Sequence, residues 1–290
     1  FAAHISTLLP GWLMRMRRIV DRQIPDDHRG AQKHVKEHIS AHYDLGNEMF
    51  AAFLDPTLTY SSARFDPAIP LSEQSLESAQ LRKIDQALDA AEVGPGTNLL
   101  EIGTGWGTLA IRAAQRGARV TTLTLSVEPA ALAQEGVTAA GLADQIEIRV
   151  SDYREISGTF DAAVSIEMIE AVGERYWPDY FGQLSSLVRP GGAIVVQSIL
   201  MSHERYLATR HSFGWIQKHI FPGGLIPSQL VIERQAKAVG LLTQRIDSFA
   251  SDYAETLRRW RLRFLEAWPR IGSEGFGEDF GRAWEFYFAY

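Results

Sequence analysis

The most informative stretch of this 290-residue sequence is Leu100-Glu101-Ile102-Gly103-Thr104-Gly105-Trp106-Gly107. An apolar strand runs here directly into glycines at every second position. A glycine-rich turn between a strand and a helix lets a ligand approach the backbone, with amide N–H groups free at the start of the helix. The spacing is GxGxG and not the dinucleotide pattern GxGxxG, because position 108 is Thr. With the acidic Glu101 two positions before Gly103, the loop favours S-adenosylmethionine (SAM) over a dinucleotide, and a simple tight turn is the alternative.

Strands and helices alternate on both sides of this loop. Apolar or β-branched runs predict strands at 98–102, 119–125, 146–150, 162–166 and 193–199. Helices are expected at 75–91, 108–115, 129–140 and about 175–188. This alternation predicts an α/β fold with a parallel, doubly wound, Rossmann-like sheet.

Polar residues after the next two strands extend the predicted cofactor site. Thr124 and Leu125 end the second strand, where the ribose of a nucleotide would lie, and the nearest carboxylate there is Glu128. Asp152 and Tyr153 follow the third strand, where a carboxylate suits an adenine amine. A helix N-cap is the alternative for Asp152.

Composition excludes several classes of protein. Hydrophobic residues make up 46% of the chain, charged residues 22%, and the formal net charge is −6, as in soluble globular proteins. Cys is absent, which excludes a disulfide framework. The sequence contains no run of 18 apolar residues, the length needed to cross a bilayer. With no recognisable signal peptide, we expect a cytoplasmic protein. The histidines show no metal-ligand spacing, and the acidic body lacks the basic stripe of a nucleic-acid-binding protein.

Residues 1–40 differ from the rest of the chain, with a net charge of +3 beside Trp12 and several aliphatic residues. Such a stretch is typical of a helix on an anionic lipid surface, and a helix packed on its own domain is the alternative. We expect an N-terminal helical segment at 1–72 and the sheet domain at 73–290. Residues 200–236 interrupt the alternation and predict a lid insertion. Residue 1 is Phe, and we expect both natural termini to lie outside this sequence.

Five motifs in a fixed order carry a resemblance to a known family: residues 42–47 (HYDLGN), 58–62 (LTYSS), 103–107 (GTGWG), 168–173 (MIEAVG) and 220–224 (IFPGG). From about residue 38 onward, the sequence resembles the cyclopropane-fatty-acyl-phospholipid synthase family, which includes the mycolic acid cyclopropane synthases. The resemblance implies a seven-stranded SAM-dependent methyltransferase sheet with extra helices over a lipid channel. It also implies methyl transfer from SAM to the double bond of an unsaturated acyl phospholipid. Within the cofactor site it places Tyr60 and Ser61, and it places His42 and Tyr43 in a helix that closes over SAM.

The family binds bicarbonate as a catalytic base, and the resemblance implies which residues would hold it here. Glu170, Ile199 and Tyr253 match three of the family's bicarbonate-binding residues. The family's Cys is Ser62 in this sequence, and its His is Gln197. Both replacements can donate hydrogen bonds to an anion, but neither readily carries a proton near neutral pH. A helix-capping carboxylate is the alternative for Glu170, and a core tyrosine for Tyr253.

The Tyr-Ser-Ser pattern, the Gln-x-Ile pattern and residues 215–218 (WIQK) resemble one branch of the family, the tuberculostearic acid methyltransferases or 10-methylenestearate synthases. This branch implies a mid-chain methylene or methyl group formed through a carbocation. A cyclopropane ring, a small soluble substrate and a catalytically silent SAM- or lipid-binding protein are the alternatives. The implied partners are the acyl phospholipid, the inner face of the membrane, a second copy of the chain and a reductase.

Overall fold

Five parallel strands form the sheet in residues 46–272 and 276–289, the part of the chain that this computed structural model describes. They are β1 (Asn98–Ile102), β2 (Arg119–Thr124), β3 (Ile146–Val150), β4 (Phe160–Ile166) and β5 (Val188–Gln197). Their order is β3-β2-β1-β4-β5, and every neighbouring pair is parallel. Because the strands are parallel, the loops that follow them meet at one carboxyl edge.

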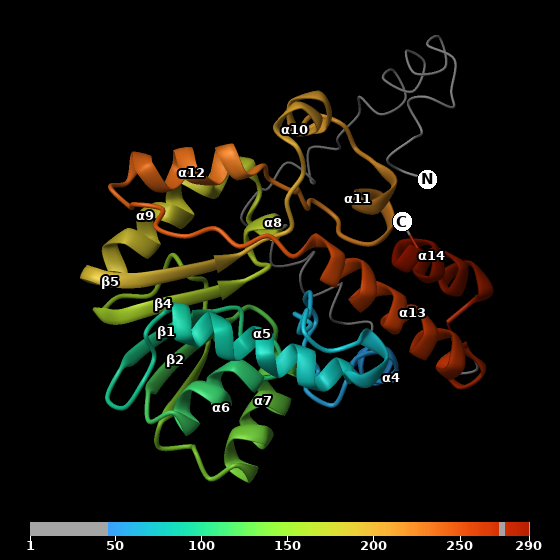
Figure 1. Ribbon diagram of the computed structural model, residues 1–290, viewed down its shortest axis with the longest axis horizontal. Helices are drawn as coiled ribbons and strands as arrows, with labels where there is room; N and C mark the ends of the chain where they lie inside the picture. The colour runs from blue at the N-terminus through green and yellow to red at the C-terminus, as the bar shows by residue number, and fades with distance from the viewer. Residues whose placement is uncertain (1–45, 273–275, 290) are drawn as a thin grey trace.

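Successive residues of β1 point to opposite faces of the sheet and belong to two separate cores. Leu99 lies in the core shared with α5 (Leu76–Ala90), α6 (Thr108–Gln115) and α7 (Val127–Ala139). Leu100 lies in the core shared with α9 (Trp177–Leu187) and α12 (Gln229–Ala238). Figure 1 shows these two helical layers on either side of the sheet. The predicted doubly wound α/β architecture is therefore confirmed.

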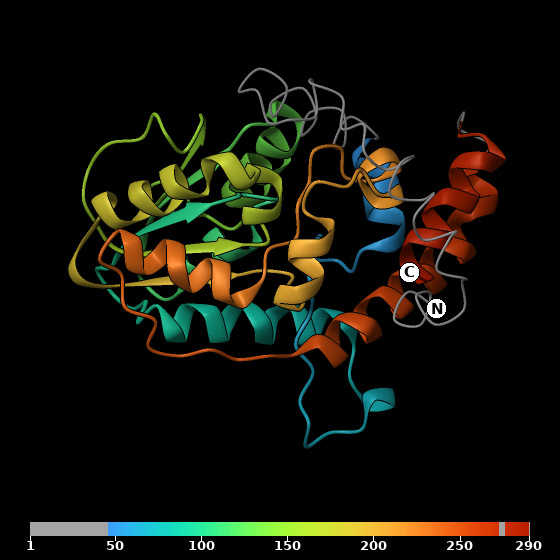
Figure 2. The ribbon, with the colours of Figure 1, turned by 90° about the horizontal axis from the view of Figure 1, so that it is seen from above.

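A third, aromatic core lies beyond the carboxyl edge of the sheet. There α4 (Asn47–Phe53) packs against α13 (Ala250–Ile271), and α13 packs against α14 (Glu278–Ala289), as Figures 1 and 2 show. Phe50, Phe53 and Trp260 are fully buried within it. Neither α13 nor α14 was predicted from the sequence. None of the helices within the described ranges is both long enough and apolar enough to cross a bilayer.

The number of strands differs from the seven that the family resemblance implied. Residues 241–249 follow α12 without joining a ladder in the described structure. Their backbone lacks a neighbouring strand there, and Leu242 is 84% exposed. Within residues 46–272 and 276–289, only the five runs that showed an apolar strand pattern in the sequence pair with one another. The expectation of seven strands was wrong for the described residues because it came from the resemblance and not from strand periodicity.

Residues 200–236, which the sequence predicted to form a lid insertion, divide into two parts. The first part contains α10 (His203–Thr209) and α11 (Trp215–His219), followed by a turn whose Leu225 N–H donates to the backbone oxygen of Glu170 (2.9 Å). Residues 229–236 instead belong to α12, where Ala236 is buried against the sheet. The basic segment 1–40 and the predicted cofactor-covering residues His42 and Tyr43 lie outside the described residues.

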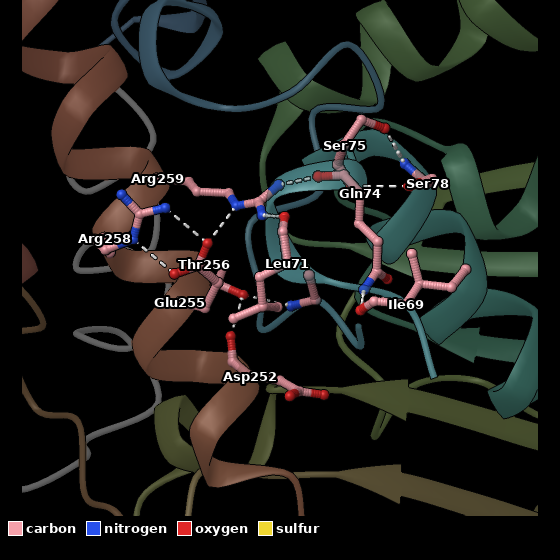
Figure 3. Close-up of polar contacts among 11 residues, drawn as sticks. Ile69, Leu71, Gln74, Ser75, Ser78, Asp252, Glu255, Thr256, Arg258 and Arg259 are labelled. Carbon is pink, nitrogen blue, oxygen red and sulfur yellow. Dashed lines mark hydrogen bonds and ion pairs between the residues drawn. The ribbon is translucent and has the colours of Figure 1, made fainter. Parts of the chain in front are cut away.

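The chain that follows Ser62 is anchored to the first turns of α13 by Asp252 and Thr256, two side chains that Figure 3 labels. Thr256 Oγ1 accepts a hydrogen bond from the Ala63 N–H (3.1 Å). Asp252 Oδ2 accepts one from the Phe65 N–H (3.1 Å). Because both bonds fix backbone atoms directly after Ser62, α13 sets the position of a predicted site residue nearly 200 residues away in the sequence.

Arg259 extends this anchor to the end of the same segment. Its guanidinium donates to the carbonyl oxygens of Leu71 (2.6 Å) and Gln74 (2.5 Å). We expect Arg259→Met to lower the free energy of unfolding by about 2 kcal/mol, since two charge-assisted hydrogen bonds are lost. The matched control is Arg258→Met, whose side chain pairs with Glu255 at the surface and should cost less than about 0.5 kcal/mol. Equal losses in urea unfolding of the two variants would contradict the anchoring role.

Candidate active site

The glycine loop joins β1 to α6 in a backbone conformation that side chains disfavour. The backbone φ is +103° at Gly103, +52° at Gly105 and +92° at Gly107. The Gly103 N–H donates to Leu123 O (2.9 Å), which ties the loop to β2. A Cβ added at Gly103 would lie 2.7 Å from the side chain of Met168. Glycine is therefore required here both by the backbone and by the space available.

A pocket opens beside this loop at the carboxyl edge of the sheet. Four of the residues predicted to bind the cofactor line it: Thr124, Leu125, Asp152 and Tyr153. The Asp152 carboxylate is buried and accepts two hydrogen bonds from the Arg154 guanidinium, at 2.8 and 2.5 Å. It does not cap a helix, because a turn follows it. Glu128, the carboxylate nearest to the ribose position in sequence, is exposed in the first turn of α7 and does not line the pocket.

Glu101 is buried at the end of β1, directly before the loop. It is 3% exposed, and its Oε2 atom has no hydrogen-bond partner. Burial raises its pKa to about 8, although a hydrogen bond from Thr122 and the charge of Lys83 oppose this shift. A buried carboxylate oxygen without a partner suits an ammonium group. The free oxygen of Glu101 therefore fits the ammonium group of SAM, and bound SAM would supply an electrophilic methyl group. The pairing of Asp152 with adenine stays a prediction.

Lys83 on α5 is a functional candidate that the sequence interpretation missed. Its Nζ donates to Ser61 Oγ (2.6 Å), and it is 3% exposed. Burial lowers its pKa to about 8, against the charges of Glu167, Asp55 and Glu101. A signal was present, because Lys83 falls at the helical spacing of the buried residues of α5. The predicted cofactor residues Tyr60 and Ser61 do not line the pocket; they lie at this lysine and at the aromatic core.

Glu170 lies in the short helix α8 (Ile169–Val172) and faces the end of β5. Its Oε1 atom accepts hydrogen bonds from the Ile199 N–H (2.6 Å) and from Ser198 Oγ (2.8 Å). Its Oε2 atom is buried and has no partner. Burial and, to a lesser extent, the neighbouring charge of Glu167 together raise the pKa of Glu170 to about 8. The structure thus brings the predicted residues Glu170 and Ile199 into direct contact.

Glu167 is a second carboxylate in this site, and the sequence interpretation did not single it out. Its Oε1 atom accepts hydrogen bonds from the Ser62 N–H (2.9 Å) and from Gln197 Nε2 (2.9 Å). Burial raises its pKa, while these two bonds and Lys83 oppose the rise. Its φ is +51°, a left-handed conformation that costs a non-glycine residue about 1–2 kcal/mol. The available signal was an acidic residue immediately after a strand, at the carboxyl edge of the sheet.

Tyr253 completes the set of predicted catalytic residues. It is partly buried at the start of α13, and its pKa is raised well above the ordinary value by burial and by the charges around it, including those of Glu167 and Glu170. The hydroxyl of Tyr287, from α14, forms a hydrogen bond with Tyr253 and accepts one from Tyr60 Oη (3.4 Å). A line of tyrosine hydroxyls therefore runs from the two carboxylates into the aromatic core.

The residues present do not fit the bicarbonate that the resemblance implied. The backbone N–H of Ser62 and the side chain of Gln197, at the positions of the family's Cys and His, already donate to Glu167. The Ile199 N–H already donates to Glu170. A further anion would have to compete for these donors beside two carboxylates, which is electrostatically unfavourable.

The raised carboxyl pKa values predict how stability depends on pH. Glu101 and Glu170 have pKa values of about 8 in the folded protein against ordinary values of 4.5, so the native state binds more protons than the unfolded state between these limits. The free energy of unfolding should therefore fall as pH rises from about 4.5 to about 8, by up to about 1.4 kcal/mol per pH unit for each group. Urea unfolding at several pH values measures this slope. A smaller slope is expected for Glu170→Gln, and an unchanged slope would contradict the assignment.

In the described residues, no group of three His, Asp or Glu side chains is arranged to hold a metal ion.

Sequence comparison identifies known proteins that are similar to this chain. A family model described as mycolic acid cyclopropane synthetase matches residues 30–290. The chain is 47% identical over 293 residues to tuberculostearic acid methyltransferase UfaA1 of Mycobacterium tuberculosis, covering 100% of this chain and 69% of that protein. It is 34% identical over 247 residues to cyclopropane-fatty-acyl-phospholipid synthase of Escherichia coli, covering 85% of this chain and 61% of that protein. The chain thus spans about two thirds of the length of the first relative and less than two thirds of the second.

Solved structures agree with the sequence comparison. Mycolic acid cyclopropane synthase CmaA1, complexed with SAH and CTAB, matches with a TM-score of 0.78 at 27% identity, over 87% of this chain and 90% of that one. Cyclopropane synthase MmaA2 from Mycobacterium tuberculosis matches with a TM-score of 0.79 at 29% identity, over 87% and 90% of the two chains. The SAH in the first of these structures is the product that SAM leaves after methyl transfer.

Proposed function

This chain belongs to the mycolic acid cyclopropane synthetase family, and on that premise we propose that it methylates the double bond of an unsaturated fatty acyl chain carried by a phospholipid. The chain is a SAM-dependent methyltransferase. The glycine loop and the free oxygen of Glu101 support a SAM site at the carboxyl edge of the sheet. The acyl substrate and the product are the parts of this function that we argue from the site.

One observation carries the lipid substrate: the two buried carboxylates adjoin an aromatic core. Tyr60 lies 5.1 Å from Phe50 and 5.4 Å from Trp260, between ring centroids, and Tyr253 lies 6.4 Å from Trp260. Apolar rings of this kind exclude water from a hydrocarbon chain and stabilise a nearby cation by about 0.5–2 kcal/mol each. A carbocation formed on an acyl chain needs both a dry environment and a base.

The reaction places specific demands on the residues of the site. An isolated alkene is a weak nucleophile, so it must be held close to the methyl group and in line with it. Attack leaves a carbocation on the carbon next to the newly methylated one, and a base must then remove a proton. The buried carboxylates of Glu167 and Glu170 support this step, because they are basic groups hydrogen-bonded to Ser62 and Ile199.

We favour a mid-chain methylene or methyl branch as the product. Ser62 and Gln197, which stand at the Cys and His positions of ring-forming relatives, support this choice, as does the 47% identity to a tuberculostearic acid methyltransferase. A hydride shift before proton loss gives an exocyclic methylene, and a partner reductase would convert it into a methyl branch. We further propose that the basic segment 1–40 holds the enzyme at an anionic membrane surface.

Mass spectrometry of acyl chains tests the proposal. The protein is incubated with SAM and vesicles of dioleoyl phospholipid, and vesicles of distearoyl phospholipid serve as the control because they lack a double bond. We expect a mass gain of one CH2 on oleoyl chains alone. A product that takes up hydrogen on catalytic hydrogenation is a methylene branch, and a resistant product of the same mass is a ring. Binding of SAM without any product would contradict the proposed function.

A further inference from the structure

We propose that the side chain of Glu167 is the base that removes the proton from the carbocation, in the place where relatives of this family would hold bicarbonate. The inference rests on the proposed function and identifies the group that completes its reaction. It is carried by the contact of one carboxylate with Ser62 and Gln197, two of the residues that the family resemblance assigned to an anion.

The carboxylate of Glu167 accepts the hydrogen bonds that a separately bound anion would otherwise accept at this position. One of its oxygens accepts hydrogen bonds from the Ser62 N–H and from the Gln197 amide, both at 2.9 Å. These two donors are therefore already paired with a group of the chain itself. The position is also close to the methyl donor, because the next residue, Met168, packs against Gly103 of the glycine loop. Base and donor therefore lie on adjoining parts of the same sheet edge.

The charges around Glu167 favour one resident carboxylate over a second, exchangeable anion. Lys83 attracts Glu167, and Glu170 repels it, as their mutual effects on pKa show. Lys83 already faces the charges of Glu167, Asp55 and Glu101, so bicarbonate would add a further negative charge to this group. Two neighbouring carboxylates repel each other when both are ionised. One member of such a pair therefore accepts a proton readily.

The backbone at Glu167 offers an independent argument. A φ of +51° suits glycine, and a glutamate persists in such a conformation where the surrounding structure holds it. The Glu167 N–H donates to Gln197 O (2.8 Å), which fixes this conformation at the end of β4. Strained non-glycine residues cluster at functional sites, and the side chain here points to the donors described above.

The step balances without an oxidant or reductant. The π electrons of the alkene form a bond to the methyl carbon, and the sulfur–methyl bond breaks with its electron pair left on sulfur. A hydride shifts from the newly substituted carbon to its cationic neighbour, which moves the positive charge beside the new methyl group. A C–H bond of that methyl then breaks, its electron pair forms the exocyclic double bond, and the proton goes to a carboxylate oxygen of Glu167.

Two variants of the full chain test this assignment. Glu167→Gly removes the carboxylate, suits the backbone conformation and opens space among the donors. In buffer depleted of bicarbonate we expect a loss of turnover of at least 100-fold, with binding of S-adenosylhomocysteine retained. Added bicarbonate or formate should then restore part of the turnover, an effect that a merely structural role would not produce. The control is Glu92→Gly, a glutamate at φ +54° on an exposed turn, which should keep full activity.

The wild-type protein gives the decisive comparison. We expect its turnover of dioleoyl phospholipid to be unaffected when bicarbonate is removed from the buffer. Wild-type turnover that depends on added bicarbonate, or full turnover by Glu167→Gly in depleted buffer, would overturn the assignment of Glu167. A wild-type protein that forms no product in either buffer would instead contradict the proposed function, so the two failures are distinguishable.

Discussion

Replacing Gly103 with alanine should weaken SAM binding by about 100-fold and lower the rate of methyl transfer with it. Gly103 has φ +103°, which an alanine adopts only at a cost of about 1–2 kcal/mol. The new Cβ would also lie 2.7 Å from Cγ and Sδ of Met168, a side chain that lines the cofactor pocket. Relieving that overlap costs about 1–3 kcal/mol more and moves either the loop or the pocket wall. We expect stability to fall by about 2–4 kcal/mol and affinity for S-adenosylhomocysteine to fall by about 100-fold.

Calorimetric titration with S-adenosylhomocysteine measures the affinity, and urea unfolding measures the stability. The matched control is Gly94→Ala, at a glycine outside the left-handed region with no atom within 4 Å of an added Cβ. That variant should bind normally. Normal binding by Gly103→Ala as well would show that the loop does not cradle the cofactor.

Replacing Glu170 with glutamine should lower the rate of turnover by about 10²-fold or more while leaving SAM binding intact. Glutamine can still accept the hydrogen bond from the Ile199 N–H, so the position of the side chain is preserved. It cannot ionise or take up a proton, however, so a pair of neighbouring carboxylates becomes a single carboxylate. The coupling by which the charge of Glu167 raises the pKa of Glu170 is then lost, and with it one of the two groups that can accept a proton.

Single-turnover kinetics with dioleoyl phospholipid vesicles measures this loss, and titration with S-adenosylhomocysteine should give an affinity within about twofold of wild type. Glu135→Gln, on the exposed face of α7, is the control for the same chemical change and should be fully active. Full activity in Glu170→Gln would remove Glu170 from the mechanism.

Much of the fold was predictable because its signals are local. The apolar run of β1 and the Ala-rich α6 predicted their own bounds, and the glycines between them predicted a loop with unusual backbone angles. The pocket residues Thr124, Leu125 and Asp152 were predictable for the same reason, since the ends of parallel strands meet at one edge. The helices α13 and α14 were not predicted, although α13 anchors the chain beside Ser62.

The two buried carboxylates, Glu167 and Glu170, show which contacts local sequence patterns do not predict. Glu170 belongs to a motif that the sequence displays, but Glu167 gains its meaning from Ser62, 105 residues away, and from Gln197, 30 residues away. Lys83 likewise reaches Ser61 only because α5 packs beside the segment that α13 holds. No spacing in the sequence records these contacts.

The sequence by itself determined the order of the functional elements along the chain: a strand, a glycine loop, and acidic residues at the ends of later strands. Side-chain periodicity and backbone angle are properties of neighbouring residues, so they are legible without a structure. Only the tertiary structure decided which hydrogen-bond donors face which carboxylate and which acidic side chains are buried away from water. Hydrogen bonds and desolvation depend on distances of a few ångströms between distant segments, and packing alone sets those distances.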